Sequence, residues 1–175
     1  MHNEDKRNRL KAFEKVVDTF ESALLRYASR LTNNPTSAED IVQNAFVKFI
    51  KNWNGPYDAY GDIKPWLYRV VHNEAVDFIR AEARRQKLHD EHGDECIGRT
   101  TSPTDNHQDS DEILLALNQL TTRERELVIL KVYEEKSYKE IAEITGLTTN
   151  NVGVSLHAAM KKLASILDKK GGDYV

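Results

Sequence analysis

The chain has 175 residues, of which 39% are hydrophobic and 30% charged, and its formal net charge is −3. These values are typical of one or two small soluble domains rich in exposed helix, and we expect neither a membrane span nor a signal peptide, because no long apolar stretch is present. The single cysteine excludes an internal disulfide and is typical of the cytoplasm.

The first 50 residues predict two amphipathic helices. Apolar residues recur every three or four positions along the first helix: Leu10, Phe13, Val17, Phe20, Leu24, Tyr27 or Ala28, and Leu31. Pro35 ends this pattern, and Thr36 or Ser37 is the predicted N-cap of the second helix, with Asp40 in the capping-box position. The predicted buried stripe of the second helix is Val42, Ala45, Phe46, Phe49 and Ile50. Its opposite face carries Glu39, Asp40 and Gln43.

Residues 52–62 predict a loop that is rich in glycine and proline but also contains Trp53, Tyr57 and Tyr60. Aromatic side chains in such a loop either pack on the core or stack with a ligand. A helix follows, with Pro65 expected in its first turn, where the missing N–H leaves no hydrogen bond unmade.

The helix after Pro65 has two faces of different character. Its predicted core stripe is Leu67, Val70, Val71, Ala75, Phe78 and Ile79. The other face carries Tyr68, Arg69, His72, Asn73, Val76 and Arg80. Aromatic, amide and guanidinium groups together suit unstacked bases and phosphates, although the same pattern also fits an ordinary helix with a solvated polar face.

An acidic segment follows this helix. Residues 90–112 contain eight acidic residues and one arginine, a net charge of −7, so the rest of the chain carries +4. The segment lacks apolar periodicity and predicts a flexible linker over residues 90–110. His89, His92 and Cys96 have spacings that a metal can use, but three candidates in a linker are too few, so we expect no metal site and no cofactor.

The C-terminal part predicts a second helical module. A short helix contains Ile113, Leu114, Leu117 and Leu120, and capping boxes at Thr121–Glu124 and Ser137–Glu140 open two further helices. Gly146 then reverses the chain before a last helix over residues 149–167. The predicted inward residues of this helix are Val152, Leu156, Ala159, Leu163 and Ile166. Two helices joined by a short glycine turn are typical of a helix-turn-helix, and the alternative is a simple helical hairpin.

Three motifs in this order resemble a known family. They are Asp40-Ile-Val-Gln43 followed by Phe46; Trp66-Leu-Tyr-Arg69 with Asn73, Asp77 and Arg80; and Ser137-Tyr-Lys-Glu-Ile-Ala142 before the helix-turn-helix. The chain resembles the extracytoplasmic-function sigma factors of bacterial RNA polymerase, in the sigma-70 family, over about residues 10–88 and 111–168. The resemblance implies an all-α fold of two small helical domains, 1–89 and 111–175, joined by a flexible acidic linker, 90–110.

The resemblance also implies promoter recognition and transcription initiation at a specific regulon. In this family the first domain grips the clamp helices of the largest polymerase subunit and melts the −10 element. By position, the polymerase-binding residues are Asp40, Gln43 and Asn44. The residues that match the family's −10 contacts are Tyr57, Trp66, Arg69, Asn73, Arg80, Arg84 and Arg85. Of these, Tyr57 and Asn73 are expected at a flipped-out base.

In the same family the second domain binds the flap of the second-largest subunit and reads the −35 element. The residues expected there are Thr149, Asn150, Asn151, Ser155, His157 and Lys161. The chain departs from the family pattern at positions that usually carry arginine or lysine, here Gly153, Val154, Ser155, Ala158 and Met160. Guanine readout by a forked arginine is therefore not expected from these positions, whereas asparagine suits adenine.

The implied partners are core RNA polymerase, promoter DNA and an anti-sigma factor, in the cytoplasm. We do not expect an enzyme, because the acidic residues lie on solvated helix faces without a paired nucleophile or a glycine-rich phosphate loop. Two other classes stay open: a stand-alone helix-turn-helix regulator with an N-terminal sensing or dimerisation domain, and a helical polymerase-binding adaptor. The motif at Asp40–Gln43, together with the helix of Trp66, favours the sigma factor.

Overall fold

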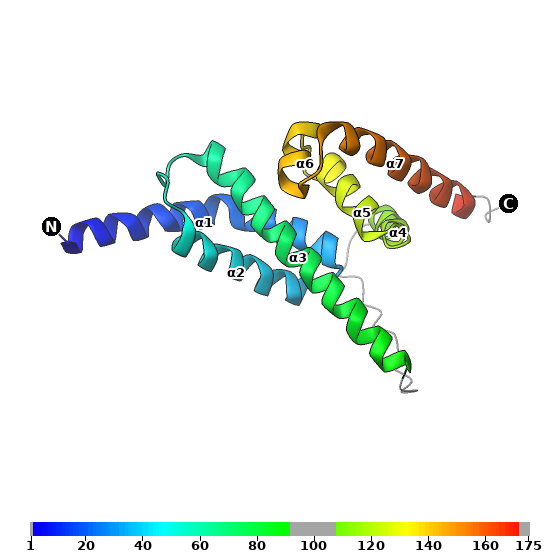
Figure 1. Cartoon of the computed structure of the whole chain (residues 1–175), viewed down its shortest axis with the longest axis horizontal. Helices are drawn as coiled ribbons and strands as arrows, with labels where there is room; N and C mark the ends of the chain where they lie inside the picture. Colours follow the sequence, from blue (N-terminus) through cyan, green and yellow to red (C-terminus); the bar gives the residue numbers. More distant parts are fainter. Residues whose placement is uncertain (1, 92–107, 172–175) are drawn as a thin grey trace. The chain divides into compact units, whose positions relative to one another are not determined.

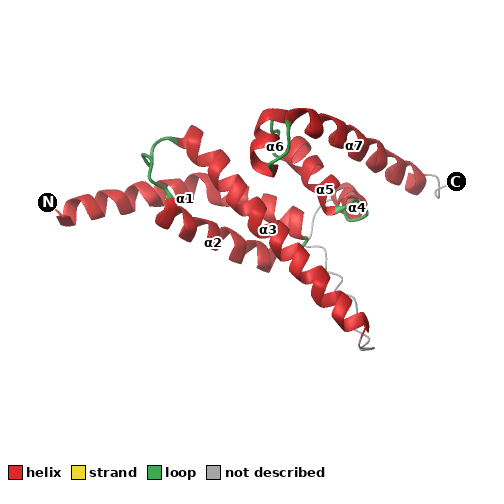
Figure 2. Ribbon diagram, viewed as in Figure 1, coloured by secondary structure: helices red, strands yellow, loops and turns green. Residues whose placement is uncertain are grey.

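The structure is a computed structural model that describes residues 2–91 and 108–171. Within these ranges every regular element is a helix, which confirms the predicted all-α class (Figure 2). The chain divides into two compact units, Met1–Arg84 and Arg85–Val175, and the division falls inside a helix. Residues 92–107 of the predicted linker, with His92 and Cys96, lie outside the described residues.

Unit 1 consists of α1 (His2–Thr32), α2 (Pro35–Asn52) and the part of α3 (Tyr60–Glu91) up to Arg84. The short connection at residues 33–34 brings α2 back along α1, and α3 packs onto this pair (Figure 1). The core is apolar and includes Val16, Phe20, Leu24, Leu31, Ile41, Val42, Phe46, Phe49, Ile63, Leu67 and Val71. None of the helices in the described ranges combines the length and hydrophobicity needed to cross a membrane.

The buried stripes of α1 and α2 differ from the predicted ones at their ends. Leu10 is 57% exposed, and Val16 is buried where Val17 was expected. In α2, Ile50 is 47% exposed, and Ile41 is buried instead. Val16 and Val17 are neighbours in the sequence, and the hydrophobic pattern alone does not decide which of the two points inward.

The predicted start of α2 is wrong. Asn34 is the N-cap, and its side-chain oxygen accepts a hydrogen bond from the backbone N–H of Ser37 at 3.1 Å. Pro35 occupies the first turn, so the proline that ends α1 also begins α2. Neither Thr36 nor Ser37 is the cap, because both already lie inside the helix.

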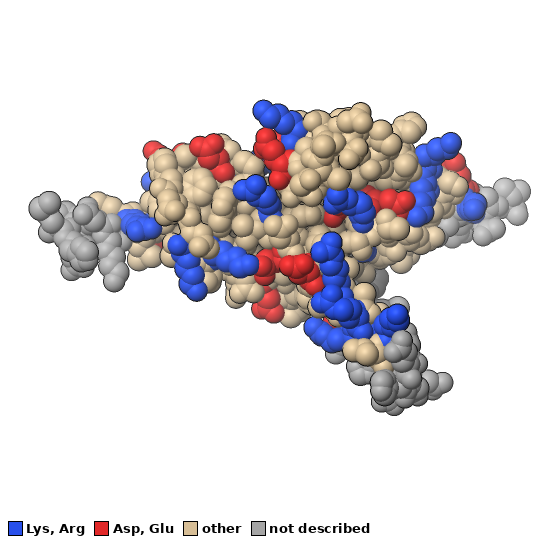
Figure 3. Space-filling view, in the orientation of Figure 1, with Lys and Arg blue, Asp and Glu red and all other residues tan. Residues whose placement is uncertain are grey.

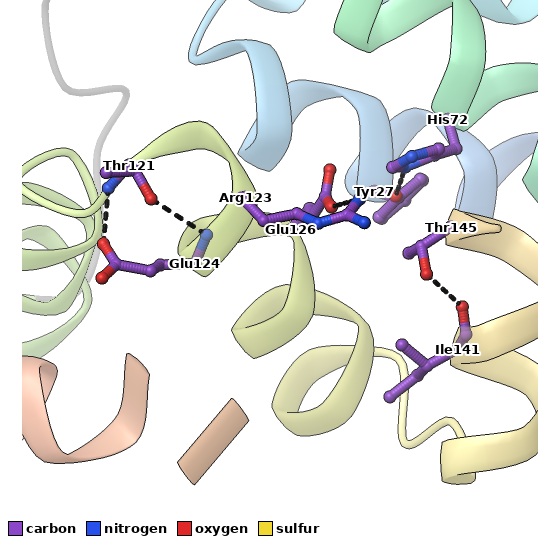
Figure 4. A network of polar contacts seen from close by, with 8 residues as sticks. All are labelled: Tyr27, His72, Thr121, Arg123, Glu124, Glu126, Ile141 and Thr145. Carbon is purple, nitrogen blue, oxygen red and sulfur yellow. Dashed lines mark hydrogen bonds and ion pairs between the residues drawn. The ribbon is translucent and has the colours of Figure 1, made fainter. Parts of the chain in front are cut away.

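Two predictions for α3 are also corrected. The helix begins at Tyr60, so Pro65 lies inside it and not in its first turn. Tyr68 and His72 are buried and do not belong to an exposed polar face. The hydroxyl of Tyr27 on α1 hydrogen-bonds Nδ1 of His72 at 3.0 Å (Figure 4), and the rings of Tyr27 and Tyr68 lie 5.5 Å apart.

Unit 2 continues from Arg85 through α4 (Gln108–Leu117), α5 (Thr122–Val128), a π-helical turn η1 (Ile129–Tyr133), α6 (Tyr138–Thr145) and α7 (Thr149–Gly171). Helix α7 packs against α4, α5 and α6. The core includes Ala116, Leu117, Leu120, Leu127, Ile129, Leu130, Ile141, Ile144, Val152, Leu156, Ala159 and Leu163.

The start and stop signals predicted for unit 2 are confirmed. Thr121 and Glu124 form a complete capping box at the start of α5 (Figure 4), and Ser137 forms another with Glu140 at the start of α6. Gly146 ends α6 with φ 72°, a left-handed conformation that favours glycine. The predicted helix-turn-helix is therefore α6, the turn at Gly146, and α7.

Candidate nucleic-acid and partner-binding surfaces

The outward side of α2 combines polar and apolar groups. Asp40, Gln43 and Asn44 are all exposed, as predicted for a partner-binding site. Val47 and Ile50 lie on the same side and are 46% and 47% exposed. We call these five residues the α2 partner face. The sequence pattern placed Ile50 in the core and did not single out Val47, so the apolar half of this face was missed.

On this face two exposed branched aliphatic side chains lie beside one carboxylate and two amides. Such a mixture of apolar and polar groups is suited to a protein partner. Next to this face, Lys48 of α2 forms an ion pair with Glu74 of α3. The pair joins the exposed sides of α2 and α3 next to the partner face.

Exposed arginines occur along α3, and basic side chains gather toward its end (Figure 3). Arg69, Arg80, Arg84 and Arg85 are all exposed, and we call them the α3 basic stripe. From Arg69 to Arg84 the stripe extends about 22 Å at 1.5 Å per residue. Arg80 also lies 3.8 Å from Asp77, but both side chains are largely exposed, and such a pair contributes little. The stripe is suited to contact successive phosphates.

An aromatic cluster surrounds Phe49 where α2 meets the loop before α3. The ring of Trp53 stacks on Phe49 with centroids 5.4 Å apart, and the rings of Tyr57 and Trp66 meet Phe49 edge-on at 5.5 and 5.6 Å. Trp66 is half-buried in this cluster, so most of its ring serves packing. The cluster links the loop at residues 53–59 to the core of unit 1.

Tyr57 is held in place from two sides. Besides its contact with Phe49, its hydroxyl accepts a hydrogen bond from Nε of Arg9 at 3.3 Å, and the Arg9 guanidinium lies 5.7 Å from its ring centroid. Tyr57 lines a shallow hollow of about 330 Å³ between the loop and α1. The other lining residues are Asn8, Lys11, Ala12, Lys15, Asp58 and Tyr60. Aromatic rings beside two lysines suit an unstacked nucleotide.

Asn73 lies apart from this hollow. It is exposed on α3, seven residues beyond Trp66, which is two helical turns or about 10 Å along the axis. Asn73 forms no hydrogen bond with the loop at residues 53–59 in the described part of the chain. Of the two predicted base-contacting residues, Asn73 is therefore exposed and Tyr57 is half-buried, and no hydrogen bond joins them.

The first turns of α7 carry the predicted −35 residues. Thr149, Asn150 and Asn151 are exposed in the first turn, and the hydroxyl of Thr148 accepts a hydrogen bond from the backbone N–H of Asn151 at 3.2 Å. His157 and Lys161 are exposed about two and three turns later. Ser155 is only half-exposed and lies at the edge of this surface.

A second hollow, of about 500 Å³, lies on this surface and was not foreseen from the sequence. Its lining residues are Tyr138, Thr149, Asn150, Gly153, Val154 and His157. Val154 is 65% exposed. The ring of Tyr138 lies over Gly153, where an added Cβ would be 3.5 Å from the ring. The signal that was available is the apolar Val154 among polar residues of the predicted recognition helix.

An ion pair joins the start of α5 to α7. The Lys162 ammonium group lies 2.8 Å from Oε2 of Glu124, which also accepts the capping hydrogen bond from Thr121. The Lys162 contact and the backbone hydrogen bond from Thr121 lower the pKa of Glu124 below its ordinary value of 4.5. The carboxylate therefore stays charged to a lower pH than an isolated glutamate, and its contact with Lys162 joins α7 to the start of α5.

Two family models match the chain. Sigma-70 region 2 matches residues 16–85, and sigma-70 region 4 matches residues 110–163. The RNA polymerase sigma-E factor of Streptomyces avermitilis is 30% identical over 162 residues, which cover 92% of this chain and 88% of that protein. The RNA polymerase sigma factor SigV of Bacillus subtilis is 31% identical over 145 residues, with coverage of 83% and 84%.

Two solved structures share the fold. One is the sigma factor RpoE in complex with the anti-sigma factor NepR from Bartonella quintana, with a TM-score of 0.69, 23% identity, and coverage of 90% of this chain and 98% of that one. The other is CnrH in complex with the cytosolic domain of CnrY, with a TM-score of 0.66, 24% identity, and coverage of 91% and 90%.

Proposed function

Because this chain belongs to the sigma-70 family of RNA polymerase sigma factors, we propose a specific role for each of its exposed surfaces. The chain is a sigma factor of the extracytoplasmic-function group, and it acts in promoter recognition and transcription initiation. The observation that carries the proposal is that regions 2 and 4 match in this order on two separate helical units. Its role is that of a non-catalytic subunit in the cytoplasm, where a specific regulon is transcribed.

The proposed division of labour follows the domains expected from the sequence. Residues 1–89 bind the clamp helices of the largest polymerase subunit and recognise and melt the −10 element. Residues 90–110 link this domain to residues 111–175, which bind the flap of the second-largest subunit and the −35 element. The exposed surfaces on α2, α3 and α7 support this assignment because each carries chemistry suited to its partner.

The α2 partner face is proposed to bind polymerase through Asp40, Gln43 and Asn44. Its support is that these polar groups are exposed together with Val47 and Ile50, which gives the mixed character of a protein interface. Asp40 itself contributes little to the fold, because it lies on the outside of a helix whose other side is core.

Promoter DNA is proposed to bind along α3 and α7. On α3, the basic stripe orients the DNA by phosphate contacts, while Tyr57, Trp66 and Asn73 act on the opened −10 element. On α7, the −35 contacts are Thr149, Asn150, Asn151, Ser155, His157 and Lys161.

An anti-sigma factor is the proposed regulatory partner. The support is analogy: the sigma factor RpoE is solved with the anti-sigma factor NepR, and CnrH with the cytosolic domain of CnrY. Such a partner would control the chain by covering surfaces that polymerase or DNA needs, and the α2 partner face is one candidate.

The function is tested by in vitro transcription with purified core polymerase and genomic DNA. We expect start sites that appear only when this protein is added. Asp40→Arg should weaken core binding at least tenfold without changing helicity or melting temperature. The matched control is Asp18→Arg, the same charge change at an exposed position of α1. Equal core binding by both variants and the wild type would remove Asp40 from the interface.

A further inference from the structure

The most exposed large hydrophobic side chain among the described residues lies in the proposed DNA-reading helix. Val154, in the second turn of α7, is 65% exposed, more than any other large apolar side chain of the described ranges. It lines the hollow of about 500 Å³ together with Asn150 one turn before it and His157 one turn after it. These residues are spaced by three and four positions, so they lie on one side of the helix.

The floor and one wall of this hollow are held in place by unit 2 itself. Gly153 forms part of the floor, and the ring of Tyr138 lies against it. Tyr138 is the first residue of α6, directly after the capping box of Ser137 and Glu140, and the Lys131 ammonium group lies 5.4 Å from its ring centroid. The hollow therefore exists before any ligand binds, and its shape does not depend on a long flexible side chain.

The chemistry of the lining restricts what it can read in a DNA major groove. No arginine occurs in α7, and no lysine or arginine lines the hollow. Guanine presents two acceptors that are best met by a forked cation, and the hollow offers none. Thymine presents a methyl group, which an apolar side chain contacts, and adenine presents the acceptor–donor pair that suits asparagine.

We propose that α7 reads A·T base pairs in the −35 element, with Val154 in contact with the C5-methyl group of thymine and Asn150 hydrogen-bonded to adenine. The inference rests on the proposed function, because it assumes that the first turns of α7 enter the major groove. Val154 becomes a specificity-determining residue, and Tyr138 and Gly153 shape the space into which the methyl group fits.

DNA is the occupant that the surrounding groups favour. Thr149 and Asn151 present exposed polar side chains at the start of α7, and Lys161 lies two turns beyond Val154 on the same side. Phosphate-binding groups therefore lie before and after the apolar hollow along α7, as expected for a helix that crosses a groove. An apolar protein partner would leave Lys161 without a matching charge.

The test uses the holoenzyme and a promoter that it transcribes, with the −35 segment randomised and selected for binding. We expect A·T pairs at the positions that face α7. Each thymine there is then replaced by deoxyuridine, which removes only the methyl group. Loss of one buried methyl-sized contact should weaken binding about fourfold at the contacted position.

Variants assign this effect to Val154. With Val154→Ala, which removes two methyl groups, the difference between thymine and uracil promoters should shrink, while Met160→Ala, an exposed apolar residue of α7 outside the hollow, should keep the full difference. Selection of G·C pairs, or equal binding of thymine and uracil promoters by the wild type, would overturn the inference while leaving the sigma-factor function intact. Absence of any promoter-dependent transcript would overturn the proposed function and the inference together.

Discussion

The two helices proposed to contact promoter DNA differ in their chemistry. Helix α3 exposes four arginines, three of them (Arg69, Arg80 and Arg84) on one side, whereas the reading surface of α7 exposes amides, a histidine, a valine and one lysine, and α7 contains no arginine. Phosphate contacts give affinity that depends on salt, while base contacts give specificity. The comparison indicates that α3 supplies most of the electrostatic affinity and that α7 contributes readout with a small electrostatic share.

The largest expected effect comes from removing the arginines at the end of the α3 basic stripe. Arg80→Ala, Arg84→Ala and Arg85→Ala combined should lower the slope of log K against log salt by about 2 to 3, since each lost phosphate contact contributes roughly 0.7–0.9. Promoter binding by the holoenzyme, titrated over a range of salt, measures this slope. Lys161→Ala on α7 is the control and should change the slope by less than about 1. Equal changes of the salt slope in both variants would contradict the proposed difference between α3 and α7.

The next effect concerns Tyr57, which belongs to the aromatic cluster of unit 1. Tyr57→Ala should weaken promoter opening by about 1–3 kcal/mol, the value of one base stacked on an aromatic ring. Permanganate footprinting measures the open bubble, and a pre-melted template should restore transcription. Tyr57→Phe keeps the ring and loses only the hydrogen bond from Arg9, so it should open promoters nearly as well as the wild type. A defect that persists on the pre-melted template would argue against a role in strand opening.

A smaller effect concerns the N-caps of the helices, which differ between the two units. Ser137→Ala removes a side chain that caps α6 and should destabilise unit 2 by about 1 kcal/mol. Ser37→Ala, at a similar sequence motif in unit 1, should change stability by at most a few tenths of a kcal/mol, because Asn34 is the cap there. Hydrogen exchange of the full chain, read peptide by peptide, distinguishes the two. A similar loss of protection at both sites would contradict the assignment of the caps.

The smallest expected effect is a pH dependence of the stability of unit 2, which arises from Glu124. Its pKa is lowered in the folded state, chiefly by Lys162, so its contribution to stability is present above pH 4.5 and is lost as the pH falls through the lowered value. NMR titration of the carboxyl carbon measures this pKa directly. Lys162→Ala should raise it toward 4.5, while Lys161→Ala should leave it unchanged. A titration unaffected by Lys162→Ala would show that the contact is not populated in solution.

Much of unit 2 was predictable because its signals are local. The capping boxes at Thr121 and Ser137 and the glycine at position 146 each act within four residues, and all three are confirmed. The apolar residues of the last helix follow a single period, so the buried face of α7 was also predictable. A local signal needs no knowledge of the rest of the fold.

Unit 1 was less predictable because its decisive contacts are distant in sequence. The hydrogen bond between Tyr27 and His72 joins residues 45 positions apart, and it turns His72 inward although its helix face looked polar. The hollow beside Tyr57 is likewise formed by residues of α1 that no motif connects to the loop. The arginines of α3 were predicted as exposed because charge alone keeps them in water.

The aromatic cluster around Phe49 has an optical consequence. The chain has two tryptophans, Trp53 and Trp66, and both belong to this cluster in unit 1, with ring centroids 6.1 Å apart. Trp53 opens the loop that carries Tyr57, and its indole N–H donates to the carbonyl of Pro56 at 3.3 Å. Tryptophan fluorescence, excited beyond the tyrosine absorption band, therefore comes from unit 1 alone, at the base of the loop proposed to hold an unpaired nucleotide. It reports on strand opening without an added label, and unit 2, which has tyrosines but no tryptophan, does not contribute to it.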